Sequence, residues 1–103
     1  MICKQLILNT DSNGNLSGSI GSNDYYEKRV SYISVFANTT NTSQIPTLQI
    51  FNQGVLEGIS NNALNDVGEG SINWSSGTEL SFVGQNFPAS IQVIIGIFYE
   101  VIK

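Results

Sequence analysis

Clusters of turn-forming residues interrupt this chain of 103 residues about every 8–12 positions, and that spacing limits what the chain can fold into. The segments between the clusters are short and rich in Ile, Val, Phe and Tyr, which favour strands. The longest helix-compatible stretch, 62–67, is brief and rich in Asn. The chain is therefore predicted to be all-β. We expect a small antiparallel β-sandwich or jelly-roll-like fold of about six to eight short strands, in one domain over 1–103.

Each expected strand lies between two such clusters. Strands are predicted over 4–10, 16–21, 29–40, 47–54 and from Ile91 onward, with a hairpin over 71–84. Segment 55–60 is either a return strand or loop, and 61–70 is predicted to be loop. The first two strands should pair as a hairpin, because the turn formers DSNGN (11–15) separate them.

The last expected strand, within SIQVIIGIFYEVIK (90–103), is apolar on both faces. The face predicted to be core carries Ile91, Val93, Ile95, Ile97, Tyr99 and Val101. On the other face, Ile94, Phe98 and Ile102 form a second apolar row, where a solvated face would be mostly polar.

Strand 29–40 has the same property. Its two faces carry Ile33, Val35 and Ala37 on one side and Val30, Tyr32 and Phe36 on the other. A sandwich of this size has only two inner faces, and a large exposed apolar patch usually marks a protein interface. We therefore predict an interface made by Ile94, Phe98, Ile102, Val30, Tyr32 and Phe36. The alternative is that a loop such as 55–68 covers this face.

The residues that usually carry catalysis or bind metal are scarce. The chain has no histidine and one cysteine, so it lacks an imidazole base, an internal disulfide and a Cys/His zinc site. Cys3 is expected to be a small buried residue. Eight acidic residues against four basic ones give a net charge of −4, which disfavours nucleic acid as a partner. Lys28 and Arg29 are expected to be solvated at a strand start. No enzyme, cofactor or metal is predicted.

Two acidic segments contain oxygen-bearing side chains that calcium could use. DSNGN (11–15) begins like a calcium loop, but Leu16 stands where glycine is required and Ser22 where a bidentate glutamate is required. A hairpin turn is therefore favoured there. Asp66 and Glu69 lie among amide side chains, and a solvated loop is favoured for them too.

Aromatic residues near loops leave a binding module open as an alternative function. Aromatic rings and amide groups are what a carbohydrate site uses, and adjacent Tyr25 and Tyr26 cannot both point inward on an extended segment. A glycan or receptor site is therefore considered at Tyr25, Tyr26, Asn38, Asn41 and Asn61. Trp74 is expected to pack in the core or the interface.

No membrane insertion is expected. The start MICKQLILNT predicts no secretory signal, since its apolar stretch is too short. The apolar C-terminal run is also shorter than the about 20 residues that a membrane-spanning helix needs.

The order of elements resembles that of small virion structural proteins of tailed bacteriophages, of the capsid decoration type. The resemblance rests on an early LILNTDSNGNLSGSIG, the aromatic and basic YYEKRVSYISVFANTT, then PTLQIFNQG and WSSGTELSFVGQNFPASIQVIIGIF. It covers nearly the whole chain and consists of strand and turn signatures. It implies a β-sandwich without catalytic groups, made in the host cytoplasm and located in the virion. The partners it implies are other copies of the chain, as a dimer or trimer, and other virion proteins.

Overall fold

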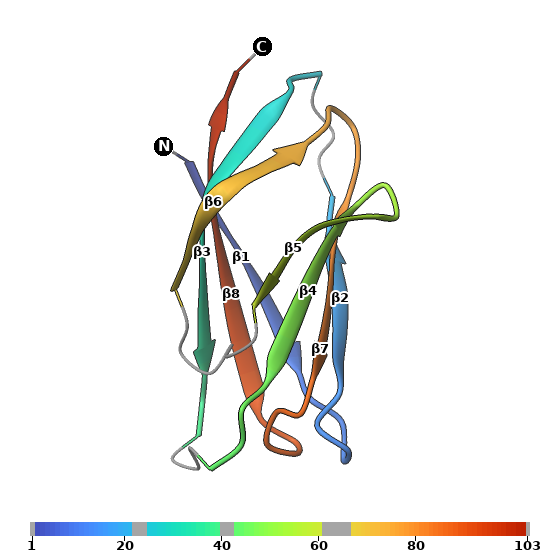
Figure 1. Ribbon diagram of the computed structural model, residues 1–103, viewed down its shortest axis with the longest axis vertical. Helices are drawn as coiled ribbons and strands as arrows, with labels where there is room; N and C mark the ends of the chain where they lie inside the picture. Colours follow the sequence, from blue (N-terminus) through green and yellow to red (C-terminus); the bar gives the residue numbers. More distant parts are fainter. Residues whose placement is uncertain (1, 22–24, 40–42, 61–66, 103) are drawn as a thin grey trace.

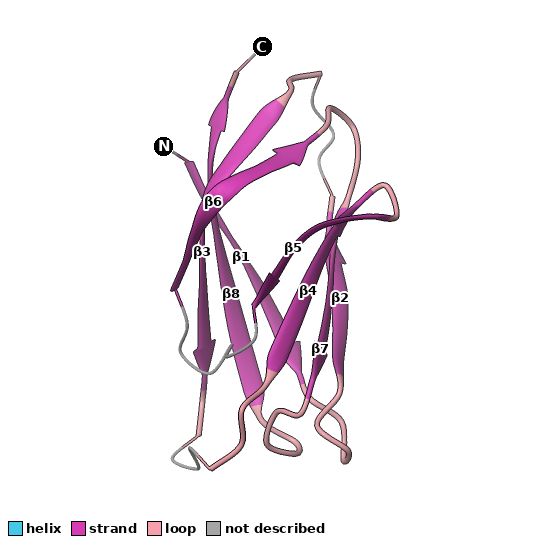
Figure 2. Ribbon diagram, viewed as in Figure 1, coloured by secondary structure: helices cyan, strands magenta, loops and turns pink. Residues whose placement is uncertain are grey.

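The computed structural model describes residues 2–21, 25–39, 43–60 and 67–102, which form a sandwich of two antiparallel four-stranded sheets (Figure 1). The strands are β1 (Ile2–Asn9), β2 (Leu16–Ile20), β3 (Lys28–Ala37), β4 (Thr47–Asn52), β5 (Val55–Ser60), β6 (Val67–Trp74), β7 (Leu80–Gln85) and β8 (Gln92–Val101). One sheet has the order β1-β8-β3-β6 and the other β2-β7-β4-β5. The described part contains strands and loops and no helix, which confirms the all-β prediction (Figure 2).

Strand pairing differs from the prediction at two turns. DSNGN does form a turn, but β1 pairs with β8 and β2 pairs with β7, so the two flanking strands enter opposite sheets. The predicted hairpin over 71–84 is wrong for the same reason, because β6 pairs with β3 and β7 pairs with β2 and β4. Both turns connect the two layers, so each strand buries its apolar side against the opposite sheet instead of pairing with its chain neighbour.

The turn NQG (52–54) does make a hairpin. Gln53 and Gly54 both have positive φ, 54° and 77°, as a tight two-residue hairpin turn requires. Strand β5 returns beside β4, with Asn52 opposite Val55, which resolves segment 55–60 as a strand. The loop predicted over 61–70 is partly wrong, because β6 already begins at Val67 and pairs with β3.

The core fills the space between the sheets. On β8, Val93, Ile95 and Ile97 are fully buried and Tyr99 is 4% exposed, which confirms most of the predicted core face. Val101 departs from it at 45% exposure, because β8 continues past the end of the core. Trp74 is fully buried from β6, as expected, and its ring packs edge-on against Tyr99 at 5.2 Å.

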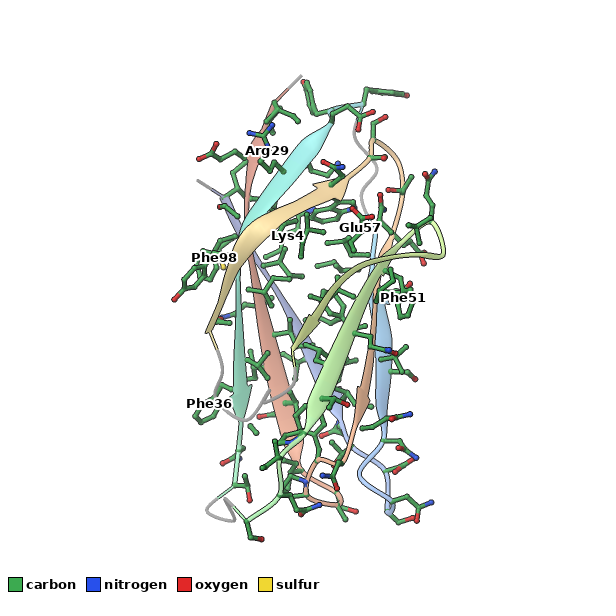
Figure 3. The ribbon with its side chains drawn as sticks, in the orientation of Figure 1. Lys4, Arg29, Phe36, Phe51, Glu57 and Phe98 are labelled. Atoms are coloured by element: carbon green, nitrogen blue, oxygen red, sulfur yellow. The ribbon has the colours of Figure 1, made fainter. Side chains whose placement is uncertain are left out.

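Lys28 is not the solvated residue that the sequence suggested. Its side chain is only 1% exposed, and its ammonium lies 4.8 Å from the centre of the Trp74 ring, in the range of a cation–π contact. The Lys28 ammonium also donates a hydrogen bond to the carbonyl of Tyr26 at 3.0 Å. Lys4 approaches the same ring at 5.6 Å (Figure 3). Arg29, one residue further, is exposed as expected.

The end of the sandwich that holds DSNGN is fixed by hydrogen bonds between its loops. The amide of Phe87 donates to the carbonyl of Gly14 at 3.1 Å, and the amide of Ser90 donates to the carbonyl of Asp11 at 3.1 Å. The buried hydroxyl of Thr10 donates to the carbonyl of Pro88 at 2.7 Å. These bonds join the β1–β2 turn to the β7–β8 turn and so hold the two sheets together.

The Asp11 carboxylate organises its own turn. One oxygen, Oδ1, accepts hydrogen bonds from the backbone amides of Asn15 and Asn13, at 2.9 and 2.8 Å. These two amides, Asn15 first, hold the pKa of Asp11 below its ordinary value of 3.8. The turn predicted in place of a calcium loop therefore has a direct structural basis, although the strands that flank it do not pair as a hairpin.

Asp11 should make the protein sensitive to acid. A carboxyl with a lowered folded-state pKa adds stability that is present above pH 3.8 and is lost as pH falls through the folded pKa. Asp11→Asn removes the charge, so its Tm should lie below that of the wild type near neutral pH, and the gap should narrow in acid. Thermal melts of both proteins over an acid pH series measure this gap. A gap that stays constant down to the lowest pH would contradict the assignment.

Candidate protein-interaction surface

A β-bulge in β3 decides which side chains reach the outer surface. The register of β3 shifts between Val30 and Tyr32 against both of its neighbours, β6 and β8. The extra residue, Ser31, reverses the alternation of side chains along the strand. Val30 therefore points into the core at 1% exposure, on the same side as Ile33 and Val35. Its predicted place in the interface is wrong, whereas Tyr32 and Phe36 do face outward.

Three strands of the first sheet place their outward side chains in register. Each row crosses β1, β8 and β3 in that order: Cys3, Phe98 and Tyr32; then Gln5, Gly96 and Ser34; then Ile7, Ile94 and Phe36. We call these nine residues the β1–β8–β3 outer face. Two apolar rows thus flank one row of small or polar residues.

The Ile7–Ile94–Phe36 row is more exposed to solvent than the Cys3–Phe98–Tyr32 row, whose two rings are half-buried. Ile7 is 56% exposed and Phe36 is 54% exposed, and Ile94 is half-buried between them. Phe98 and Tyr32 pack edge-on with their ring centres 5.1 Å apart. Figure 3 shows Phe36 and Phe98 on the outer side of this sheet, with Phe51 on the opposite side of the sandwich.

The middle row keeps this face flat. An added Cβ at Gly96 would lie 2.5 Å from the Ser34 hydroxyl and 3.4 Å from the Phe98 ring. The Ser34 and Phe98 side chains therefore lie down over the bare backbone of Gly96. A surface without a protruding side chain at its centre is suited to packing against another flat sheet.

Strand β1 supplies residues that the sequence analysis missed. Ile7 was not singled out, although its place in the alternating Cys3, Gln5 and Ile7 could have indicated an outward apolar position. Cys3 was expected to be buried and is instead an exposed free thiol, because it lies on the outward side of an edge strand. Both residues belong to the β1–β8–β3 outer face through their register with β8.

Ile102 lies apart from the predicted interface row. It is 45% exposed, follows the end of β8, and donates its backbone amide to the carbonyl of Glu27 at 2.9 Å. Glu100 and Arg29 face each other in register between Ile102 and the apolar rows, and both are exposed. Ile102 is therefore separated from Phe98 by a charged pair.

The outer face of the second sheet has a different character. Its outward positions on β2, β7 and β4 are mostly hydroxyl and amide side chains: Ser17, Ser19, Ser81, Gln85, Thr47 and Gln49. Phe51 on β4 also faces outward, in register with Leu56 on β5, which is 50% exposed. Val83 is the exposed apolar residue on β7, at 36%. A shallow cleft of about 230 Å³ opens at the end of this face near the β1–β2 turn. It is lined by Asp11, Asn15, Leu16, Ser17, Val83, Gly84 and Gln85.

The residues considered for a ligand loop do not come together. Tyr25 and Tyr26 are 93% and 53% exposed and precede the start of β3. Asn38 follows the end of the same strand, so the ten residues of β3, about 33 Å, separate them. Asn41 and Asn61 lie outside the described residues. Asp66 and the side chain of Glu69, the two acidic groups considered for calcium, also lie outside the described part of the structure.

The described residues include neither a cluster of metal ligands nor a membrane-spanning helix. No group of three or more Cys, Asp or Glu side chains is placed to hold a metal ion there. Within the same ranges, no helix is long and apolar enough to cross a membrane.

Comparison with known proteins identifies no family. No family model and no curated protein matches this chain. Among solved structures, it is similar to the nucleoplasmin-like N-terminal domain of Drosophila FKBP39, at 11% identity and TM-score 0.41, over 98% of this chain and 93% of that chain. It is also similar to the CBM36-1 domain of a multidomain xylanase from the hindgut metagenome of Trinervitermes trinervoides. That match has 11% identity and TM-score 0.41, over 92% of this chain and 97% of that chain. Likenesses this distant do not bear on function.

Proposed function

We propose that this chain is a non-enzymatic assembly protein that binds a second copy of itself through the β1–β8–β3 outer face. The observation that carries the proposal is the pair of apolar rows in register across three strands, with Ile7 and Phe36 more than half exposed. Covering such a patch removes apolar surface from water, which is the main driving force of protein association. None of these nine side chains is charged, so copies with net charge −4 bring no like charges together within the nine-residue patch itself.

The size of the sheet fits an assembly contact of modest strength. Strands β3 and β8 have ten residues each, and the whole four-stranded sheet measures about 33 by 19 Å, with the β1–β8–β3 outer face as its central part. Two whole sheets of this kind would cover roughly 1,200 Å² in total, which is the lower end of the range for specific interfaces. A contact of this size suits a repeated assembly, in which each copy is also held by its neighbours.

We place this assembly in a virion because the chain resembles small structural proteins of tailed bacteriophages. In that setting, a β-sandwich of this kind would stabilise the particle by binding other copies of itself and the shell. The outer face of the second sheet, with its hydroxyl and amide side chains beside Phe51, Leu56 and Val83, would then face solvent or the shell. This placement supports a structural role and requires no catalytic group.

Phe36→Asp should test self-association without disturbing the fold. Phe36 is 54% exposed at the β3 end of the third row, so a carboxylate there stays hydrated in the monomer and is buried only in the assembly. We expect light scattering on a sizing column to show an oligomer for the wild type and a folded monomer for Phe36→Asp across a concentration series.

Val83→Asp is the matched control for this experiment. Val83 is also an exposed apolar residue on a strand, at 36%, but it lies on the opposite sheet. The substitution Val83→Asp should therefore leave the oligomer intact. A wild type that stays monomeric at all concentrations, or a Phe36→Asp protein that stays oligomeric, would overturn the proposal.

The second candidate function is a glycan- or receptor-binding module, and it is favoured by one observation. Tyr25 is 93% exposed, and Tyr26 beside it is 53% exposed, and exposed aromatic rings are suited to stacking on a sugar. A monomeric wild type would make this pair the next target. Binding of an oligosaccharide panel would then be compared between the wild type and Tyr25→Ala.

A further inference from the structure

The β1–β8–β3 outer face is nearly symmetric about its middle row. The two apolar rows lie two residues to either side of Gly96 on β8, at Phe98 and at Ile94. Beyond the first apolar row, β8 ends in the exposed charge of Glu100, and beyond the second it begins with the exposed amide of Gln92. The outward side of β8 therefore has a charged end at Glu100 and an amide end at Gln92. Between them, one large apolar side chain lies on either side of Gly96.

If their strands stay aligned, two copies can pack face to face about a two-fold axis in two ways. An axis along the strands stacks Glu100 directly on Glu100 of the partner subunit, and like charges brought together disfavour such a contact. An axis along the Gln5–Gly96–Ser34 row turns the second copy end over end. It places Glu100 opposite Gln92 of the partner subunit and keeps the neighbouring Arg29 and Glu100 at the solvated rim.

We propose that the assembly contact is an isologous dimer whose two-fold axis runs along the Gln5–Gly96–Ser34 row. This inference rests on the proposed self-association. In this arrangement Phe98 packs on Ile94 of the partner subunit, and Tyr32 packs on Phe36 of the partner subunit. Cys3 then lies opposite Ile7 of the partner subunit. Each apolar row meets the other one, so every large apolar side chain of the face is covered.

The low profile of the surface at Gly96 supports this axis. Gly96 lies on the two-fold, beneath the Ser34 and Phe98 side chains that cover its backbone. Its missing Cβ and the flattened Ser34 and Phe98 side chains leave no protruding group at that point. The sheets can then approach to the usual spacing of about 10 Å along the whole row.

Thiol cross-linking of Ile7→Cys, with the native Cys3 kept, tests this geometry. The proposed axis places position 7 about 10 Å from Cys3 of the partner subunit, whereas the strand-parallel axis places them about 19 Å apart. A short bis-maleimide should therefore shift Ile7→Cys from the monomer band to a covalent dimer band. The wild type is the control, because its two Cys3 residues are about 17 Å apart in the proposed dimer and should stay uncross-linked.

A second variant is needed because Ile7→Cys removes apolar surface from the proposed contact and so weakens it. Gln5→Cys in a Cys3→Ser background places one thiol on the axis, about 10 Å from its own copy, and should also give the covalent dimer. A dimer in light scattering that neither variant cross-links would overturn this axis while leaving the proposed self-association standing. A wild type that is monomeric in light scattering would overturn both.

Discussion

Trp74→Ala should lower the Tm by at least about 12 °C or leave the protein unfolded at room temperature. Removing a fully buried Trp costs about 3–5 kcal/mol, and each kcal/mol shifts Tm by about 4–8 °C in a domain of this size. Trp74 is fully buried, and its indole N–H donates to the carbonyl of Thr78 at 2.9 Å. It also carries the Lys28 ammonium above its ring at 4.8 Å. One substitution therefore opens a cavity, removes a hydrogen bond and leaves a buried cation without its aromatic partner.

Trp74→Phe separates these contributions. Phenylalanine keeps a ring beneath Lys28 and beside Tyr99 but loses the hydrogen bond to Thr78, so its Tm should fall between those of the wild type and Trp74→Ala. Thermal melts followed by circular dichroism measure all three proteins. A Trp74→Ala protein that melts within about 5 °C of the wild type would show that this residue does not organise the core.

Gly14→Ala should have the second-largest effect, a loss of about 3 kcal/mol or more in the free energy of unfolding. Gly14 has a φ of +77°, which L side chains rarely adopt, and an added Cβ would collide with the backbone carbonyl of Phe87. Because that neighbour is backbone, it cannot rotate away as a side chain could. The β7–β8 turn would have to move, which would weaken the bond from the Phe87 amide to the Gly14 carbonyl.

Gly54→Ala is the matched control for the collision. Gly54 has the same φ of +77°, but nothing lies within 4 Å of the place where its Cβ would be. It should show only the conformational penalty, about 1 kcal/mol. Urea titration of both variants gives the difference directly. Equal losses for Gly14→Ala and Gly54→Ala would mean that the turn absorbs the collision at no cost.

Much of the candidate surface was accessible from the amino-acid pattern of the last strand. The alternation in β8 placed Val93, Ile95 and Ile97 in the core and Ile94 and Phe98 outside it, because side chains of a strand point alternately to its two faces. The same rule failed for Val30. A single bulged residue reverses the alternation, and nothing in the local composition marks Ser31 as that residue.

The amino-acid sequence by itself determined the all-β class, the positions of most turns and the two-sided apolar character of β8, since each depends on residues close together in the chain. Only the tertiary structure decided which strands pair, because a turn signal does not say whether its flanking strands share a sheet or cross to opposite sheets. It also decided the fate of Lys28. Burial of that ammonium depends on Trp74, which lies far away in the sequence and reaches it only through the pairing of β3 with β6. Contacts of this kind are set by packing between distant segments, which local patterns do not encode.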